Sequence, residues 1–166
     1  MEKIVSIKEV ERVEIPYVLK NCVYGSEYTK YVDDGIPKDE KIRTSGYEIM
    51  TDKQTIKLLI NDEQSCCEDW GYFISEDDIS RFIGTDLISI SVTDTELKTY
   101  SVFQEGEANK DPHYSDNNEK FPSSYMFVNI LTSEGLLQFV AYNDHNGYYG
   151  HSAYIISEQL KYKAIL

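Results

Sequence analysis

Two short segments of the chain concentrate side chains that could do chemistry. The first reads Cys66-Cys67-Glu68-Asp69-Trp70, and the second runs from Asp144 to His151 as Asp-His-Asn-Gly-Tyr-Tyr-Gly-His. A thiol beside a histidine could act as a nucleophile with its base, and imidazole, carboxylate and amide groups together could bind an ion or polarise a water. If the two segments met, one small-molecule or hydrolytic site would contain Cys66, Cys67, Asp144, His145, Asn146, Tyr148, Tyr149 and His151.

The surroundings of these residues favour a structural role over catalysis. The acids Glu63, Glu68 and Asp69 disfavour a reactive thiolate at the neighbouring cysteines. The two histidines of the second segment lie six residues apart with no helical pattern between them, which matches no trusted zinc motif. Asn146-Gly147 is a common tight-turn pair. We therefore expect no catalytic residue, no metal and no cofactor, and we expect Trp70 to pack into the core.

Each segment follows one of two similar stretches of sequence. Residues 47–62 are echoed 81 positions later by residues 128–143, and both copies continue through their loop to an apolar stretch that ends in Ile-Ser-Glu. The alternation of apolar and polar residues predicts two equivalent hairpins. One joins 47–50 to 55–60 and the other joins 127–131 to 136–142, within pseudo-repeats of about 47–75 and 128–157.

The remaining pattern is also mostly that of strands. We expect strands over 4–15, 153–156 and 160–165, and a hairpin joining 86–92 to 97–103. One short helix is expected near 76–83, with Ser75 as its N-cap and Ile79 and Phe82 on its apolar side. The predicted fold is a mostly β, α+β single domain over 1–166, with a twisted antiparallel sheet or a partly open barrel built around the two hairpins.

Negative charge is concentrated in the middle of the chain. The net charge is -13, and residues 61–119 contribute -12 through 15 acids and three basic residues. This field argues against direct nucleic-acid binding, which needs clustered Lys and Arg, and favours a basic protein partner. Residues 104–124 are expected to form a mobile acidic loop. The partner-binding residues that we predict are Asp62, Glu63, Glu68, Asp69, Asp77, Asp78, Glu105 and Glu107.

The composition indicates in which cellular compartment we expect the protein. The 166 residues include three cysteines, no run of eighteen apolar residues and a charged amino-terminal stretch, so we expect a reduced, cytoplasmic protein without a membrane segment. Fourteen tyrosines suit a protein-binding surface. The tyrosines between Tyr17 and Tyr31 offer a surface for self-association.

The combination of Cys66, Cys67 and Trp70 with Asn-Gly-Tyr-Tyr-Gly at 146–150 resembles an uncharacterised domain family of bacteria and their phages. The resembling region spans roughly 47–154, with an insertion at 104–124. The resemblance implies a bacterial or phage-encoded protein of the host cytoplasm and carries no catalytic residue.

The function expected from the sequence is a non-enzymatic, acidic protein-binding module. Its concrete form is an inhibitor, of the anti-defence or antitoxin kind, in which carboxylates mimic the phosphates of a nucleic acid. The alternative is the small-molecule or hydrolytic site between the two loops.

Overall fold

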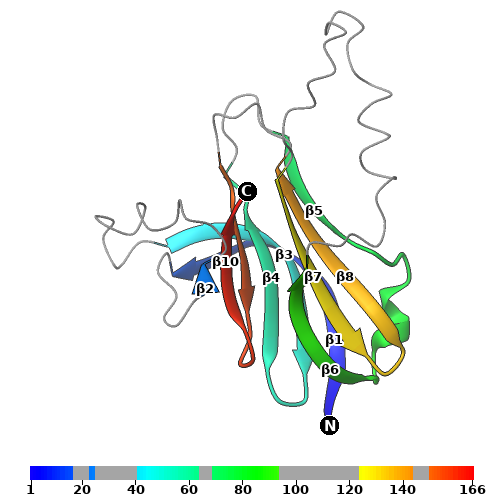
Figure 1. Cartoon of the computed structure of the whole chain (residues 1–166). Helices are drawn as coiled ribbons and strands as arrows, with labels where there is room; N and C mark the ends of the chain where they lie inside the picture. The colour runs from blue at the N-terminus through cyan, green and yellow to red at the C-terminus, as the bar shows by residue number, and fades with distance from the viewer. Residues whose placement is uncertain (17–22, 25–40, 64–68, 94–123, 144–149) are drawn as a thin grey trace, which may run out of the picture.

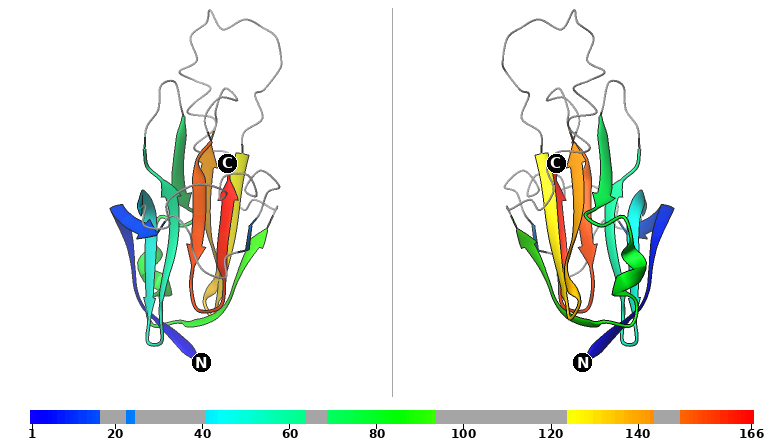
Figure 2. Two further views of the ribbon diagram at one scale, coloured as in Figure 1. Left: turned by 90° about the vertical axis from the view of Figure 1, so that its left-hand side faces the viewer. Right: turned by 90° about the vertical axis from the view of Figure 1, so that its right-hand side faces the viewer.

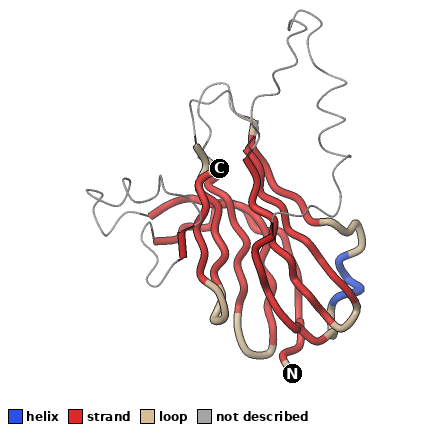
Figure 3. Tube along the Cα trace, in the orientation of Figure 1, coloured by secondary structure: helices blue, strands red, loops and turns tan. Residues whose placement is uncertain are grey.

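The computed structural model describes residues 1–16, 23–24, 41–63, 69–93, 124–143 and 150–166. In these ranges ten strands form one sheet in the order β2-β10-β9-β4-β3-β1-β6-β7-β8-β5, and only the β2–β10 pair is parallel (Figures 1 and 3). The predicted mostly β, antiparallel fold is confirmed. The elements are β1 (Glu2–Pro16), β2 (Val23–Tyr24), β3 (Lys41–Thr51), β4 (Thr55–Asn61), β5 (Trp70–Ile74), the 3₁₀ helix η1 (Ile79–Phe82), β6 (Asp86–Thr93), β7 (Ser124–Thr132), β8 (Gly135–Asn143), β9 (Ser152–Ile156) and β10 (Lys161–Ile165).

The sheet folds over into two layers. Strands β1 and β6 share only two residue pairs, at their first residues, and the sheet turns over at this junction. One layer contains β1, β3, β4, β9 and β10, and the other contains β6, β7, β8 and β5. Figure 1 shows β10, β4 and β3 on one side and β5, β8, β7 and β6 on the other, and Figure 2 shows the sheet from its two sides. Apolar residues of both layers point between them and are fully buried there, as Leu58 of β4 and Phe139 of β8 illustrate. One hydrophobic core therefore joins both halves of the sequence.

The two predicted hairpins are equivalent in the structure. The Thr51 hydroxyl, at the end of β3, accepts hydrogen bonds from the amides two and three residues later and donates to the carbonyl three residues later. Thr132, at the end of β7, makes the same three bonds. A threonine in this position closes the turn through its own side chain, so both turns keep one geometry without a shared turn sequence.

The equivalence extends to the strands that precede each hairpin. The amide of Lys3 in β1 donates to Asp52 Oδ1 at 2.8 Å, and the Asp52 amide donates back to the Lys3 carbonyl. In the same way, the amide of Asp86 in β6 donates to Ser133 Oγ at 3.0 Å, and the Ser133 amide donates to the Asp86 carbonyl. The repeating unit is thus a strand, a long connection, a hairpin and a final strand.

The predicted helix is present as a single 3₁₀ turn, but its expected cap is wrong. Asp78 caps η1, because its side chain accepts the Ser80 amide at 3.1 Å. Ser75 instead extends the sheet beyond β5, donating its amide to the Gln138 carbonyl at 2.8 Å and accepting the Gln138 amide on its hydroxyl.

The strand expected over 86–92 also forms, but within the described residues β6 pairs with β7 and, at its base, with β1. The predicted arm 97–103 and the predicted loop 104–124 lie outside those residues, except for Ser124.

The two ends of the layered sheet differ in their connections. The turns between β3 and β4, β7 and β8, and β9 and β10, together with the segment that contains η1, lie at one end, which we name the turn end (lower end of Figure 1). The connections between β1 and β3, β4 and β5, β6 and β7, and β8 and β9 begin and end at the other, which we name the crossover end.

Substitution of Gly46 in β3 tests how closely β3 and β4 of the first hairpin pack. A Cβ atom at Gly46 would lie 2.0 Å from the carbonyl oxygen of Leu58, which cannot move without breaking the β3–β4 ladder. We expect Gly46→Ala to lower the free energy of unfolding by about 3 kcal/mol or more. Gly84→Ala is the matched control, since φ is +85° there but no atom lies within 4 Å; its expected loss is about 1 kcal/mol. Urea denaturation measures both, and equal losses would contradict the packing argument.

Candidate functional site

Two crossovers carry the chain between the layers at the crossover end. After β4 the chain passes to β5, which pairs with β8 of the other layer. After β8 it passes to β9, which pairs with β4. Each repeat therefore gives its last strand to the layer of the other. The segments that the sequence singled out, around Cys66-Cys67 and around 144–149, are these crossovers.

The described ends of the two crossovers meet. Trp70, the first residue of β5, stacks on His151, with ring centroids 5.0 Å apart and planes inclined by 27°. His151 is 2% exposed, and its Nδ1 lies 2.8 Å from the carbonyl oxygen of Asn61. A carbonyl oxygen only accepts, so Nδ1 carries the proton. The backbone of His151 also exchanges two hydrogen bonds with Leu166. His151 therefore connects the ends of the two crossovers through its contacts with Trp70 and Asn61. Trp70 packs against the core, as the sequence predicted.

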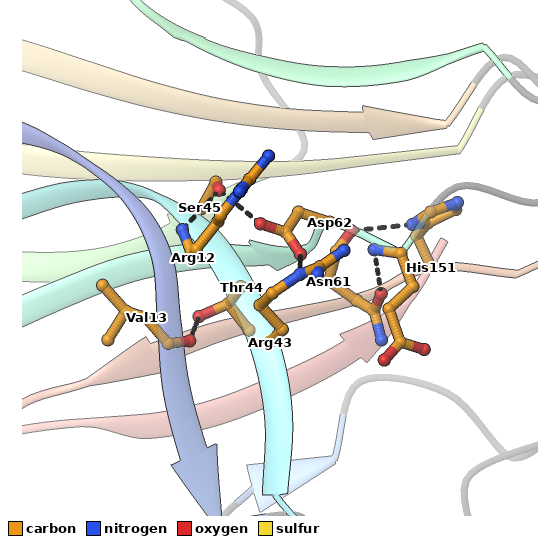
Figure 4. Close-up of polar contacts among 9 residues, drawn as sticks. Arg12, Val13, Arg43, Thr44, Ser45, Asn61, Asp62 and His151 are labelled. Carbon is orange, nitrogen blue, oxygen red and sulfur yellow. Dashed lines mark hydrogen bonds and ion pairs between the residues drawn. The ribbon is translucent and has the colours of Figure 1, made fainter.

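Asp62 begins the first crossover, and two side chains donate hydrogen bonds to its carboxylate. Arg43 Nε donates to Oδ1 at 2.7 Å and Ser45 Oγ donates to Oδ2 at 2.7 Å (Figure 4). The Ser45 hydroxyl in turn accepts the amide of Arg12 at 3.1 Å. Burial by itself raises the pKa of Asp62, but the hydrogen bonds and positive charge from Arg43, Ser45 and Arg12 outweigh it, and the pKa is lowered. The carboxylate is an internal structural charge.

Arg43 and Ser45 belong to β3, and a local irregularity of β1 adds the Arg12 amide to the network around Asp62. The pairing of β1 with β3 shifts register between Val10 and Val13, and Arg12 has a φ of +56°, which is uncommon for a residue other than glycine. The shift turns the Arg12 amide toward Ser45. Nothing in the sequence around Arg12 or Ser45 signals this bulge, so these residues and Arg43 were missed. The only sequence feature that indicated this network was the position of Asp62 directly after the predicted strand 55–60.

The structure separates the other predicted residues. Glu63 and Asp69 are exposed at the crossover end, whereas Asp77 and Asp78 are exposed near the turn end, where Asp78 caps η1. The acids therefore do not form one compact patch within the described residues. The predicted residues that lie outside the described ranges are Cys66, Cys67, Glu68, Glu105, Glu107, Asp144, His145, Asn146, Tyr148 and Tyr149.

Among the described residues, no three His, Cys, Asp or Glu side chains are grouped so that they could hold a metal ion. Nor does any helix in the same ranges have the length and apolar character needed to cross a membrane.

The Asp62 network predicts a pH-dependent contribution to stability. Because the pKa of Asp62 is lowered on folding, the charged form stabilises the protein above about pH 4, and this stabilisation is lost as the pH falls through the folded-state value. We expect Asp62→Asn to cost about 1–2 kcal/mol at pH 7 and progressively less below pH 4. Glu63→Gln, at the exposed neighbour, serves as control and should change little. A constant deficit for Asp62→Asn from pH 7 to pH 3 in urea denaturation would refute this role.

Comparison with known proteins agrees with the resemblance of the loop motifs to an uncharacterised family. A family model described as a domain of unknown function (DUF7448) matches residues 2–155, and so includes β1 and β3 as well as the expected region. No curated protein and no solved structure matches the chain. The chain belongs to the DUF7448 family of domains of unknown function.

Proposed function

We propose that this domain is a protein-binding module that engages a basic partner through its crossover end. The observation that carries the proposal is the placement of the long connections. Thr93, Ser124, Asn143 and Trp70 lie close together in neighbouring strands of one layer, and His151 joins them to the other layer. Binding residues are commonly carried on loops that a rigid scaffold positions, and the end of a two-layer β fold is such a scaffold.

The distribution of acidic residues also favours the crossover end as the binding surface. The connection between β6 and β7, residues 94–123, holds seven acids and three lysines. At or near the turn end, by contrast, several acids have internal partners. Asp86 pairs with Lys3 at 3.2 Å, Glu76 lies 3.8 Å from Arg81, and Asp78 caps η1. The connections that begin and end at the crossover end therefore hold most of the acidic residues of the middle segment.

In its most concrete form, the proposed module inhibits a nucleic-acid-binding protein by presenting carboxylates in place of phosphates. Steering by a field of one sign speeds association with an oppositely charged surface and makes it sensitive to salt. An interaction of this kind needs spaced carboxylates and no catalytic group.

Matched charge reversals test the proposal. The crossover-end variant combines Glu63→Lys, Glu105→Lys and Glu107→Lys, and the turn-end control combines Asp77→Lys, Glu134→Lys and Glu158→Lys, whose acids are all exposed. Both variants change the net charge equally. A basic protein recovered from bacterial lysate at low salt is then titrated with each. We expect the crossover-end variant to bind about tenfold or more weakly and the control to bind nearly as well as the native chain. Equal affinities of the two variants would contradict a crossover-end interface.

A second function is favoured by the contact between Trp70 and His151. Because their rings stack, the carboxyl-terminal ends of both crossovers lie together, and a small-molecule or hydrolytic site using Cys66, Cys67 and His145 is compatible with that placement. The buried His151 ring is committed to the Asn61 carbonyl and would position the loops rather than act as the base.

The second function predicts a reactive thiol. One of the two adjacent cysteines should react much faster than Cys22 with a disulfide reagent at neutral pH, and His145→Ala should slow that reaction, because a thiolate needs a nearby positive charge or base. Reaction of all three cysteines at the rate of an ordinary free thiol would exclude the site. Metal content of the purified protein is measured on the same sample.

A further inference from the structure

Exposed apolar side chains gather where the two layers join. Among the described residues, seven large hydrophobic residues are exposed, and six of them lie within or beside the junction of β1 and β6: Met1, Val5, Met50, Ile83, Ile88 and Leu131. The junction lies at the turn end, next to the amino terminus (Figure 1). Single exposed hydrophobic residues are normal on a protein surface, whereas a contiguous group marks a contact surface. We name these six residues the apolar ridge.

The apolar ridge has two equivalent halves, one from each repeat. The pairing of β1 with β3 shifts register at Val5, and the pairing of β6 with β7 shifts register at Ile88. Each is the extra residue of a bulge, which redirects the side chains of its strand. Val5 is 49% exposed and Ile88 is 57% exposed. Met50 in β3 and Leu131 in β7 pair with the residues that directly follow the two bulges, so they are equivalent as well.

Backbone pairing across the junction makes the first half continuous. The Gly84 amide donates a hydrogen bond to the Ile4 carbonyl at 2.7 Å. Ile83 and Val5 flank this bond on the two paired segments, so they lie close together. With Met50 beside Val5, they form one apolar surface.

The second half is continuous in the same way, and an ion pair lies between the halves. Leu87 pairs with the residue that follows Met1, so Met1 lies opposite Ile88. Lys3 and Asp86, the next pair of the ladder, form an ion pair at 3.2 Å. The Lys3 side chain is 60% exposed, whereas that of Asp86 is 19% exposed. The centre of the ridge therefore has an accessible cation beside an acid.

Acids that flank the apolar ridge are paired with bases. Besides the central pair, Lys8 pairs with Glu48 at 3.0 Å and Arg81 lies 3.8 Å from Glu76. The whole chain carries a net charge of -13, so two copies repel each other at a distance. At the ridge this repulsion is weaker than at the acidic crossover end, because the flanking acids are neutralised within each copy. The local charge therefore favours a second copy as the occupant of this surface.

We propose that the apolar ridge binds the apolar ridge of a second copy of this chain, about a twofold axis near the Lys3–Asp86 pair. A twofold interface uses the same patch on both copies and must be self-complementary. The ridge meets this requirement because its halves are equivalent. The Val5 half of one copy packs on the Ile88 half of the other, and the axis produces this contact twice. At the centre, the exposed Lys3 of each copy lies near Asp86 of the other, so the interface is complementary in charge as well as apolar.

This interface is independent of the proposed function. The ridge lies at the turn end, whereas the basic partner is proposed to bind at the crossover end. Because salt screens the repulsion between two copies that each carry -13, added salt should strengthen their association. Binding of a basic partner weakens with salt. The two proposals can therefore fail separately.

Sedimentation equilibrium of the full chain tests the interface. We expect a mass twice the 19.2 kDa of one chain at high concentration, with the dimer fraction rising with salt. Ile88→Asp removes an apolar contact and places an acid in each ridge, so it should weaken dimerisation about tenfold or more. Ser91→Asp is the matched control, since Ser91 is an exposed residue of the same strand outside the ridge and the net charge of the two variants is equal. It should dimerise nearly as the native chain does. Circular dichroism checks that both variants fold, as we expect for exposed positions.

Cross-linking identifies the orientation of the two copies. In a chain whose three cysteines are replaced by serine, Val5→Cys is introduced into one sample and Ile88→Cys into another. A short bismaleimide should link the mixture of these two samples into a dimer, because the twofold axis places the two residues opposite each other. A mixture of Val5→Cys with Ser91→Cys should be linked far less. A native chain that stays monomeric up to about 0.5 mM at high salt overturns the proposal. So does an Ile88→Asp variant that dimerises as the native chain does, or cross-linking that favours the mixture with Ser91→Cys.

Discussion

Strand β5 leaves the layer of β4 to pair with β8, and β9 leaves the layer of β8 to pair with β4. The apolar faces of both hairpins then cover each other across a single core, in which residues such as Ile60 and Ala141 are completely buried. Neither repeat possesses its own final strand, so neither can bury its hydrophobic face alone. The exchange also explains why the two crossovers meet, since both must pass between the layers at the same end.

The turn end holds the exchange in place through side chains that bond to the backbone and to each other. Glu2 is 8% exposed, and its carboxylate accepts a hydrogen bond from the Gln54 side-chain amide at 2.8 Å. The same oxygen lies 2.7 Å from the Thr51 hydroxyl, whose single proton it shares with the Gln54 carbonyl. Gln159, in the turn between β9 and β10, approaches the other oxygen of Glu2 at 3.5 Å. A buried carboxylate with several donors is tolerated, and here it links the start of β1 to the β3–β4 and β9–β10 turns. With one end fixed in this way, sequence variation in the connections at the other end need not disturb the core.

Net charge alone does not locate a binding surface in this protein. Asp62, which charge counting placed on the partner surface, is bound to Arg43 and Ser45. Asp78 has a structural role as a helix cap. An acid with an internal hydrogen-bond partner contributes to the long-range field but is less available for direct contact. Exposed acids without such a role, such as Glu63, are the better candidates for contact, and the long connections contain more acidic residues.

The sequence by itself determined the two hairpins, their equivalence and most of the strands, although β2 and β5 were not among the strands expected. Apolar alternation is a local property, and Thr51 and Thr132 close their turns within three residues, so both features can be recognised along the chain. The loop motifs likewise indicated an uncharacterised family, and the family model that matches residues 2–155 shows the membership. The tertiary structure decided which layer each final strand joins, because β5 and β9 have similar apolar patterns and either hairpin could accept either strand. It also decided that Asp62 is internal, since Arg43 and Ser45 reach it from the neighbouring strand β3, and the bulge in β1, some fifty residues away along the chain, turns the Arg12 amide toward Ser45. Local pattern specifies elements, whereas partners distant in sequence are chosen by packing in three dimensions.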